Sequence, residues 1–438
     1  MKKILICINS VQSHFYSTID LAEVLRKQGI QIHYIGFSKI RDIVISHGFI
    51  YHELKSFTNK DFSLYKNKIS PFKLSENYKN IHDEMELYIK EINPNLIFVP
   101  TLRLSVFYLP VYNSKIPFLL YTNTYAGVQA SSVIPPCRYS YIPKNFEKFN
   151  MKVILLWFKR FIKYDMRVGF FLSQLLYPNL QERQIAASKK IKRYYSMNGF
   201  FYDYKRIILG PSKLDFKKQD GWVYSGINTY ERYKYIKSND KVTDFIKTDN
   251  RPIIYCCFGT SCFKFKKMNL FLEKIIGLLK KRQDWRLIIS LGGYDCKEFK
   301  IDGLSVPSNV LIENFVDQLK VLSYSNIAIF HGGFGTLKEC VKTNTPMLIF
   351  PCSYDEFGNA SRVEYHGIGI VDKTMELSFL ERKIKSYTCD IDVNKIEMEI
   401  EELLKNESYL IKIKKIMNDI IIDNESEHVV NYIKNFLN

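Results

Sequence analysis

Short apolar runs alternate with amphipathic stretches along the first part of the chain. Lys3–Ile8 and Gln31–Gly36 are apolar runs, and between them Ile19–Lys27 carries apolar residues at helical spacing and ends before a glycine. This order predicts a strand, a helix and a strand, the βαβ unit of a parallel sheet. Ser17 and Asp20 have the spacing of a capping box, so the helix is predicted to begin near Ser17. Further strands are predicted at Asn95–Val99 and Phe118–Tyr121.

The same rhythm begins again after a polar and charged stretch at residues 229–250, which is predicted to be a linker. A helix is expected at Asn269–Lys281, and the tail at Ile396–Leu437 is expected to be mostly helical. The strands predicted for this half are Pro252–Phe258, Arg286–Leu291, Val310–Ile312, Ile327–Phe330 and Met347–Phe350. Two such arrays predict an α/β chain with two doubly wound, Rossmann-like domains that face each other across a cleft. We expect the domains at residues 1–228 and 251–425, with a last helix at 426–438 that crosses back to the first domain.

The composition is that of an ordinary globular protein. It is 46% hydrophobic and 25% charged, which excludes wholesale disorder and collagen-like or coiled-coil sequence. No segment has about 18 uninterrupted apolar residues, so no membrane-spanning helix is expected, and the apolar stretch Ile4–Ile8 is too short for a signal peptide. The nine cysteines include no CxxC pair, so neither a disulfide framework nor a zinc site is predicted. These features favour a reducing cytoplasm.

Almost the whole excess of positive over negative charge lies in the first half of the chain. Residues 1–228 hold 33 Lys and Arg against 16 Asp and Glu, whereas residues 229–438 hold 30 against 29. The net charge of +18 is therefore distributed asymmetrically, which indicates two domains that face different partners.

Basic and aromatic residues alternate most closely in Lys144–Arg167, within a segment at residues 144–206 that is predicted to be helical. The first interpretation is a solvated helix with a buried apolar stripe. The second is an interfacial helix on anionic lipid, and the third is nucleic-acid binding. No RNA- or DNA-binding motif supports the third interpretation, so nucleic acid is not an expected partner.

A glycine-rich turn follows the predicted strand at Ile327–Phe330. The turn contains His331, Gly333 and Gly335, and a helix begins near Thr336. Glycines let backbone N–H groups approach a ligand, and a helix N-terminus favours negative charge, so the turn suits a phosphate group. The spacing fits neither a Walker A loop nor the dinucleotide fingerprint.

These residues also have structural interpretations. Thr336 and Glu339 have the spacing of a capping box, and His331 taken alone is equally well a buried core histidine. The residues that follow favour a ligand site instead, because Asp355 and Glu356 lie just past the next predicted strand. At that edge of a parallel sheet, carboxylates accept hydrogen bonds from sugar hydroxyls.

This block resembles the donor-binding signature of the UDP-glycosyltransferases, glycosyltransferase family 1, which have the GT-B fold. The similarity spans about forty residues and extends more weakly to Gly259, Thr260 and the region Ser10–Glu23. The residues that carry it are Asn314, Phe315, Val316, Asp317, Gln318, His331, Gly332, Gly333, Phe334, Gly335, Thr336, Glu339, Thr345, Pro346, Met347, Asp355 and Glu356.

The resemblance implies a role for each position. Phe315 stands where the family has a tryptophan that stacks on the nucleotide base, Gln318 contacts the base or ribose, and Glu339 accepts the ribose hydroxyls. The diphosphate is bound by His331 and Thr336 in the loop shaped by Gly333 and Gly335, with Gly259 and Thr260 in a second loop, while Asp355 and Glu356 hold the sugar. The family's usual residues are replaced at Phe315, Asp317 and Glu356, which leaves the donor open between UDP- and dTDP-sugars.

His14 occupies the place of the family's catalytic base, just after the first strand and before the predicted helix. Imidazole is largely neutral near pH 7 and accepts a proton, so the resemblance implies an inverting, single displacement that needs no metal and no cofactor. Many relatives pair this histidine with an aspartate at the end of a later strand, but the strand ending at Pro100 and Thr101 has no carboxylate. Either His14 acts unpaired, or another residue orients it, or the activity is altered.

The predicted enzyme is a hexosyltransferase that moves a sugar from a nucleoside-diphosphate sugar to a hydroxyl of a lipophilic or aromatic small molecule. The acceptor pocket is expected in the first domain, with Phe161, Phe170, Phe171 and Leu172 as candidate lining residues. One alternative is glycosylation of a membrane lipid or lipid-linked acceptor. Others are a nucleotide-sugar epimerase and a non-catalytic nucleotide-sugar-binding partner protein. We expect a cytoplasmic protein with peripheral contact to the anionic inner face of a membrane.

Overall fold

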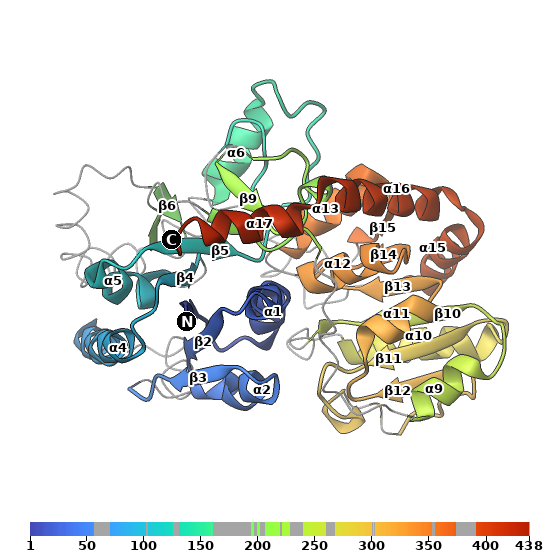
Figure 1. The fold of residues 1–438 in the computed structure, drawn as a ribbon. Coiled ribbons are helices and arrows are strands. Elements are labelled where there is room, and N and C mark those ends of the chain that lie inside the picture. Colours follow the sequence, from blue (N-terminus) through green and yellow to red (C-terminus); the bar gives the residue numbers. More distant parts are fainter. Residues whose placement is uncertain are drawn as a thin grey trace.

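Two parallel sheets organise the chain (Figure 1). The structure is a computed structural model, and it describes residues 1–56, 71–101, 104–125, 131–137, 139–160, 194–196, 199–201, 206–219, 221–227, 240–259, 268–299, 301, 303–352, 355–373 and 391–437.

The first sheet has the strand order β3-β2-β1-β4-β5-β8-β9, and every neighbouring pair is parallel. Its strands are β1 (Lys3–Cys7), β2 (Gln31–Gly36), β3 (Ile50–Glu53), β4 (Leu96–Pro100), β5 (Phe118–Thr122), β8 (Arg206–Ile208) and β9 (Trp222–Tyr224). The helices of this half are α1 (Gln12–Lys27), α2 (Arg41–Ser46), α4 (Pro71–Ile92), α5 (Leu104–Ser114) and α6 (Met151–Arg160).

The second sheet has the order β12-β11-β10-β13-β14-β15 and is also parallel throughout. Its strands are β10 (Ile253–Cys257), β11 (Arg286–Ser290), β12 (Val310–Glu313), β13 (Ile327–Phe330), β14 (Met347–Ile349) and β15 (Gly369–Val371). The helices are α9 (Asp240–Lys247), α10 (Met268–Lys281), α11 (Gln318–Tyr324), α12 (Phe334–Lys342), α13 (Glu356–His366), α15 (Val393–Lys405), α16 (Ser408–Asp423) and α17 (Glu425–Lys434).

The central strands are apolar without interruption because both faces of each sheet are covered. In β1, Ile4 and Ile6 pack into one core with residues of α1, whereas Leu5 and Cys7 pack into a second core with residues of α4 and α5. Side chains alternate between the two faces of a strand, so a strand buried on both sides shows no polar positions. The predicted strands were therefore found where the apolar runs lie.

Each sheet reverses its strand order at one point. The chain leaves β1 toward β2 and β3 and then returns to place β4 on the other side of β1. In the second sheet the same reversal lies between β10 and β13. Connections that depart in opposite directions leave a crevice at the carboxyl ends of the two strands, and ligands of open α/β sheets bind there.

Helix α1 begins earlier than the sequence predicts. It starts at Gln12 after the N-cap Val11, whose side chain cannot cap it. Ser17 and Thr18 lie inside the helix, and their hydroxyls donate to the carbonyls of His14 and Phe15 at 2.7 and 2.8 Å. The predicted capping box at Ser17 is therefore wrong, because these hydroxyls bond back to the preceding turn instead of capping a new one.

The segments expected to be a linker and a helical region contain other structure. In residues 229–250, helix α9 occupies Asp240–Lys247, and its Val242 and Ile246 are buried in the second domain's core. In residues 144–206, the described part holds α6 and the two antiparallel strands β6 (Tyr194–Ser196) and β7 (Gly199–Phe201). The helical prediction was wrong for these strands, whose aromatic residues also suit a β-ribbon.

The chain returns to the first domain at its end. Val429, Val430 and Ile433 of α17 are buried in the same core as Ile19 of α1, and Figure 1 shows α17 lying across the first half. No helix of the described residues is long and apolar enough to cross a bilayer.

Candidate functional site

The predicted donor residues follow the carboxyl ends of four strands of the second sheet, β10, β12, β13 and β14. Gly259 follows β10, Phe315 and Gln318 follow β12, the His331–Glu339 segment follows β13, and Asp355 follows β14. Because β10 and β13 are the pair at the reversal of the second sheet, these residues gather at the crevice where such sheets bind ligands.

The glycine turn holds the His331 ring between two stretches of backbone. A Cβ added to Gly333 would lie 2.6 Å from His331 Nε2, and one added to Gly259 would lie 3.0 Å from His331 Cε1. Gly259 also has φ +70° and the adjoining Gly332 has φ +86°, a region that side chains disfavour. Glycine is therefore required here by both space and conformation.

His331 is neutral at physiological pH in this position. Burial lowers its pKa to about 4 because the charged imidazolium is poorly solvated. Its Nδ1 atom is buried and has no hydrogen-bond partner among the residues that the structure describes. A buried polar atom of this kind is satisfied by a ligand group or an ordered water.

Helix α12 begins with Gly333 as its N-cap, and no side chain caps it. The structural interpretation of Thr336 and Glu339 as a capping box is therefore excluded. The first N–H groups of a helix have no intrahelical acceptor, and the helix dipole adds positive potential at the same end. This end of α12 is suited to bind a phosphate group.

Gln318, Thr336 and Glu339 form one hydrogen-bonded group. The Gln318 amide donates to Thr336 Oγ1 at 3.2 Å and to Glu339 Oε2. Its carbonyl oxygen accepts from Tyr255 Oη at 2.9 Å, which fixes the orientation of the amide. Thr336 and Glu339 are 8% and 4% exposed. The three residues to which the resemblance assigns nucleotide contacts are therefore held next to one another.

The carboxylates after β14 are tied to the glycine turn through Asn359. This side chain, which is 1% exposed, donates to the Gly332 carbonyl at 2.9 Å and to Asp355 Oδ2 at 3.2 Å. Glu356 Oε2 accepts from the Cys352 N–H at 2.8 Å. Asp355 is thus linked to the glycine turn, whereas one oxygen of Glu356 holds the backbone that leads into α13.

The structure describes Phe315 but neither Thr260 nor the residues expected to line the acceptor pocket. Phe315 is half-buried in the loop between β12 and α11, at the same edge of the sheet. Thr260 lies outside the described residues, as do Phe161, Phe170, Phe171 and Leu172 of the expected acceptor pocket.

His14 lies at the reversal of the first sheet, in the first turn of α1, which is the helix that follows β1. The predicted loop position before the helix is wrong, because the helix already begins at Gln12. The Nδ1 atom of His14 lies 2.6 Å from the Asn9 Nδ2 atom. Asn9 is 1% exposed, and its Oδ1 accepts from the Val11 N–H at 3.1 Å.

Asn9 is therefore the residue that orients His14. This contact favours the alternative in which another residue orients the histidine, because the Asn9 amide lies against the imidazole. Sequence reasoning looked for a carboxylate on β4 and overlooked an amide at the end of β1. It also overlooked Asn359. The sequence signal for this residue is its position four residues, about one helical turn, after Asp355.

The two domains bring α1 and α12 into contact, and Figure 1 shows them side by side. Phe334, the first residue of α12, packs edge-on against Tyr125 with ring centroids 4.7 Å apart. Lys338 on the same helix is 4% exposed and donates to the Leu209 carbonyl at 2.7 Å. The helix that follows the glycine turn is thus fastened to the domain that carries His14.

No group of three or more His, Cys, Asp and Glu side chains is placed to hold a metal ion within the described ranges.

Comparisons with known proteins identify similar glycosyltransferases. Residues 258–419 match the model of the glycosyltransferase family 28 C-terminal domain. An uncharacterised UDP-glucosyltransferase of Bacillus subtilis, YojK, is 27% identical over 42% of each chain, so the match spans less than half of that relative. The NDP-glycosyltransferase YjiC of the same organism is 21% identical over 86% of each chain.

Among solved structures, the kitacinnamycin glycotransferase superposes with a TM-score of 0.71 at 14% identity. The superposition covers 100% of this chain and 99% of the other. This similarity shows that the fold is GT-B.

Proposed function

We propose that this chain, a UDP-glycosyltransferase-like protein with the GT-B fold, moves a sugar from a nucleoside-diphosphate sugar to a hydroxyl of a lipophilic or aromatic small molecule. The observation that carries the proposal is the position of two sites at two sheet reversals. The phosphate loop with Gln318 and Glu339 lies at one, and His14 lies at the other. The contact between α1 and α12 joins them.

The donor would bind across the carboxyl edge of the second sheet. Its diphosphate accepts hydrogen bonds from the N–H groups at the start of α12. His331, which is neutral because burial lowers its pKa to about 4, contributes a hydrogen bond and no charge. Glu339 accepts the ribose hydroxyls, Phe315 covers the base, and Asp355 and Glu356 face the sugar.

The reaction would be a single displacement at the anomeric carbon. His14 takes the proton from the acceptor hydroxyl, the acceptor oxygen forms the new bond to the anomeric carbon, and the bond to the diphosphate oxygen breaks. The electron pair leaves with the nucleoside diphosphate, whose developing charge is stabilised by the N–H groups of α12. Attack from the side opposite the leaving group inverts the configuration, and no step calls on a metal or cofactor.

Solved relatives support the choice of ligands. The structures with the same fold include a spinosyn rhamnosyltransferase complexed with thymidine diphosphate, and the same enzyme complexed with spinosyn aglycone. A pyrimidine nucleoside diphosphate and an apolar hydroxylated acceptor are therefore the first compounds to test for this chain. Phe315 in place of the family's tryptophan leaves UDP and dTDP as equal candidates.

The test separates donor binding from transfer. We expect UDP or dTDP to raise the thermal unfolding temperature of the wild-type chain, since a ligand that binds only the folded state stabilises it. Glu339→Ala should abolish this shift. His14→Ala should keep it and lower the transfer rate about 10²–10⁴-fold, the usual contribution of a general base.

Other results would contradict the proposal. A His14→Ala variant with unchanged transfer excludes His14 as the base. Conversion of the nucleotide sugar without any acceptor identifies an epimerase, and donor-induced stabilisation without turnover across an acceptor panel identifies a non-catalytic binding protein. Product configuration, read by NMR at the anomeric carbon, tests inversion.

A further inference from the structure

Helix α6 exposes an apolar face that the proposed transfer reaction does not use. Met151, Leu155 and Phe158 are 58%, 57% and 59% exposed, and Phe149 just before the helix is 65% exposed. At 100° per residue the three helical positions fall within an arc of about 60°. Apolar side chains gathered on one exposed helix face mark an interaction surface.

The opposite side of α6 is anchored to the protein. Val153 and Trp157 are buried, and the Trp157 indole donates to the Ile134 carbonyl at 2.9 Å. Asn150 caps the start of the helix, where its Oδ1 accepts from the Lys152 and Val153 N–H groups at 3.0 and 3.3 Å. The helix is therefore fixed with its apolar face outward, and Figure 1 shows it on a projection apart from both sheets.

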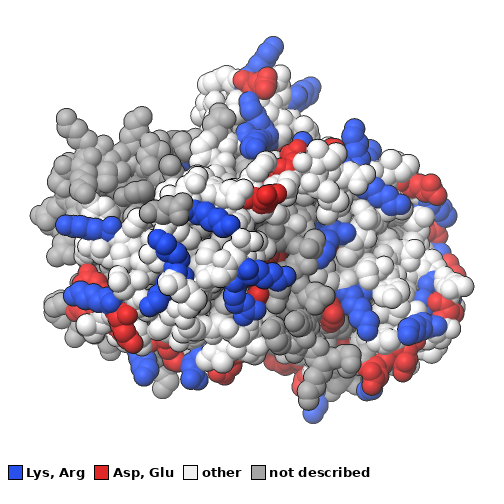
Figure 2. All heavy atoms as spheres, viewed as in Figure 1, with Lys and Arg blue, Asp and Glu red and all other residues white. Residues whose placement is uncertain are grey.

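Lysines border this apolar face. Lys152 and Lys159 follow its edge on the helix, and Lys148 precedes the helix. The ammonium groups of Lys152 and Lys159 lie 4.3 and 5.8 Å from the ring centroids of Tyr141 and Tyr139. All three lysines are exposed, and Figure 2 shows lysine and arginine side chains on the same projection.

An exposed apolar helix face bordered by lysines fits one kind of partner better than the others. A second copy of the chain would bring two lysine-bordered faces together, and like charges repel. A nucleic acid is bound through its phosphates and stacks its bases on aromatic rings, but it offers no hydrocarbon layer for Met151 and Leu155. An anionic bilayer provides both phosphates for the lysines and an acyl boundary for the apolar side chains, the pattern of interfacial helices.

We propose that the α6 face, made of Phe149, Met151, Leu155 and Phe158 with Lys148, Lys152 and Lys159, docks on an anionic membrane surface. The apolar side chains enter the boundary between headgroups and acyl chains, and the lysines remain at the phosphates. The excess positive charge of residues 1–228 attracts the same surface at longer range. Docking needs neither donor nor acceptor, so it is tested separately from the proposed transfer reaction.

The experiment is co-sedimentation of the full chain with vesicles, without substrates. We expect binding to vesicles of equal parts phosphatidylglycerol and phosphatidylcholine, and none to phosphatidylcholine alone. One lysine near an anionic surface contributes about fivefold in affinity, so K148Q/K152Q/K159Q should weaken binding on the order of 100-fold. L155E/F158E should abolish it, and the fluorescence of Phe158→Trp should shift to the blue on vesicle binding.

The matched controls are exposed isoleucines on α16, far along the chain. Ile411 and Ile422 are 62% and 78% exposed, and I411E/I422E should bind vesicles like the wild type. Cooperative thermal unfolding followed by circular dichroism verifies that every variant is folded. Equal binding to neutral vesicles, or unchanged binding by either α6 variant, overturns the proposal. So does a dimer that L155E/F158E converts to a monomer in the absence of vesicle binding, or RNA binding that survives L155E/F158E while vesicles are ignored.

Discussion

Among single residues, Asn9 decides which nitrogen of His14 carries the proton. The Val11 N–H can only donate, so the Asn9 oxygen must face it at 3.1 Å and the amide NH₂ must face the imidazole at 2.6 Å. The NH₂ then donates to Nδ1, and the neutral ring carries its hydrogen on Nε2. For Nε2 to accept a proton, the amide has to turn over and lose its bond to Val11.

Replacing Asn9 by aspartate should therefore raise the transfer rate. A carboxylate accepts from both the Val11 N–H and His14 Nδ1–H, so the Nε2 atom of the neutral ring is the one that accepts a proton. The turned amide leaves a buried donor unsatisfied at a cost of about 1–3 kcal/mol, so Asn9→Asp should increase kcat about 10–100-fold. Initial rates over a pH series measure this, and the acidic limb of the profile should move to higher pH.

Asn9→Ala is the control for this prediction. It removes the orienting contact altogether, so kcat should fall while nucleotide-induced stabilisation is retained. An Asn9→Asp variant that is slower than the wild type would show that the amide orientation seen here is the productive one.

Among the elements, those buried on both sides were predictable and those held by side-chain hydrogen bonds were not. The strands around Ile4 and Ile254 were found because their apolar runs are uninterrupted. The glycine turn was found because its glycines are visible in the sequence. Their positions are fixed because a side chain at Gly259 or Gly333 would have no room beside His331. Helix α9 was interpreted as linker because its own sequence is mostly polar, and the apolar residues that it packs into the core are few: Val242 and Ile246, with Phe245 partly buried beside them.

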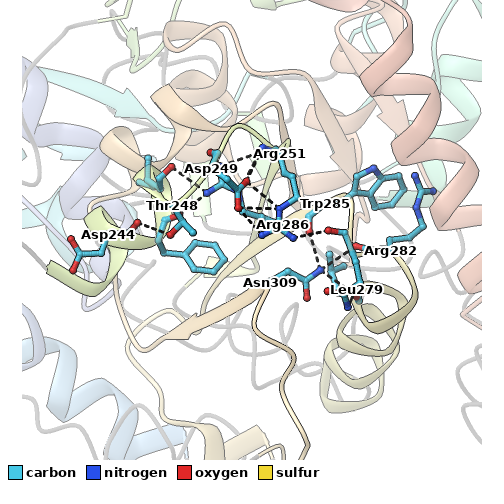
Figure 3. Close-up of polar contacts among 12 residues, drawn as sticks. Asp244, Thr248, Asp249, Arg251, Leu279, Arg282, Trp285, Arg286 and Asn309 are labelled. Atoms are coloured by element: carbon cyan, nitrogen blue, oxygen red, sulfur yellow. Dashed lines mark hydrogen bonds and ion pairs between the residues drawn. The ribbon is translucent and has the colours of Figure 1, made fainter.

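What holds α9 is an arginine from another element (Figure 3). Arg286, the first residue of β11 and 3% exposed, donates to the carbonyls of Phe245, Ile246 and Asp249 at 2.6, 3.2 and 2.8 Å. It also donates to the Arg251 carbonyl at 3.0 Å. These are carbonyls at the end of α9 and just after it, which have no helical partner. No local pattern in residues 240–250 encodes this contact.

Arg286→Met should consequently destabilise the second domain. The variant leaves several carbonyls near the end of α9 without donors, and we expect the free energy of unfolding to fall by about 3 kcal/mol. Urea unfolding followed by circular dichroism measures the change. Arg41→Met is the matched control, because Arg41 is 53% exposed and its ion pairs are 3.6 Å long, so its effect should stay below about 0.5 kcal/mol. Equal effects of the two variants would show that α9 does not depend on Arg286.

At the scale of the whole molecule, one buried ion pair joins the two domains beside the site. Asp215 of the first domain accepts from Arg362 of α13 at 2.6 and 2.9 Å. The other Asp215 oxygen accepts from Gln219 at 2.8 Å and from Tyr224 at 3.0 Å. Both charged side chains are almost fully buried. Since Asp355 is the N-cap of α13 and Asn359 lies on the same helix, the pair sets the position of both side chains relative to the first domain.

Removing one partner should cost much more than removing both. Asp215→Ala or Arg362→Met alone leaves an uncompensated buried charge or its unpaired partners, which costs about 3–5 kcal/mol. The double variant removes both charges, so its stability should lie well above the sum of the single effects. A double-mutant cycle on the free energy of unfolding measures the coupling, and additive effects would contradict it.

Kinetic measurements on the same three variants show whether the Asp215–Arg362 pair contributes to the transfer reaction. If α13 is positioned by the pair, the folded double variant should keep most of its affinity for UDP or dTDP, because Asn359, which joins α13 to the glycine turn through the Gly332 carbonyl, is unchanged. Its kcat with the whole nucleotide sugar should nevertheless fall, since Asp355 would no longer be held at the sugar. A double variant with normal kcat would assign the pair to stability alone, and one that loses nucleotide binding would show that the two domains set the phosphate loop as well.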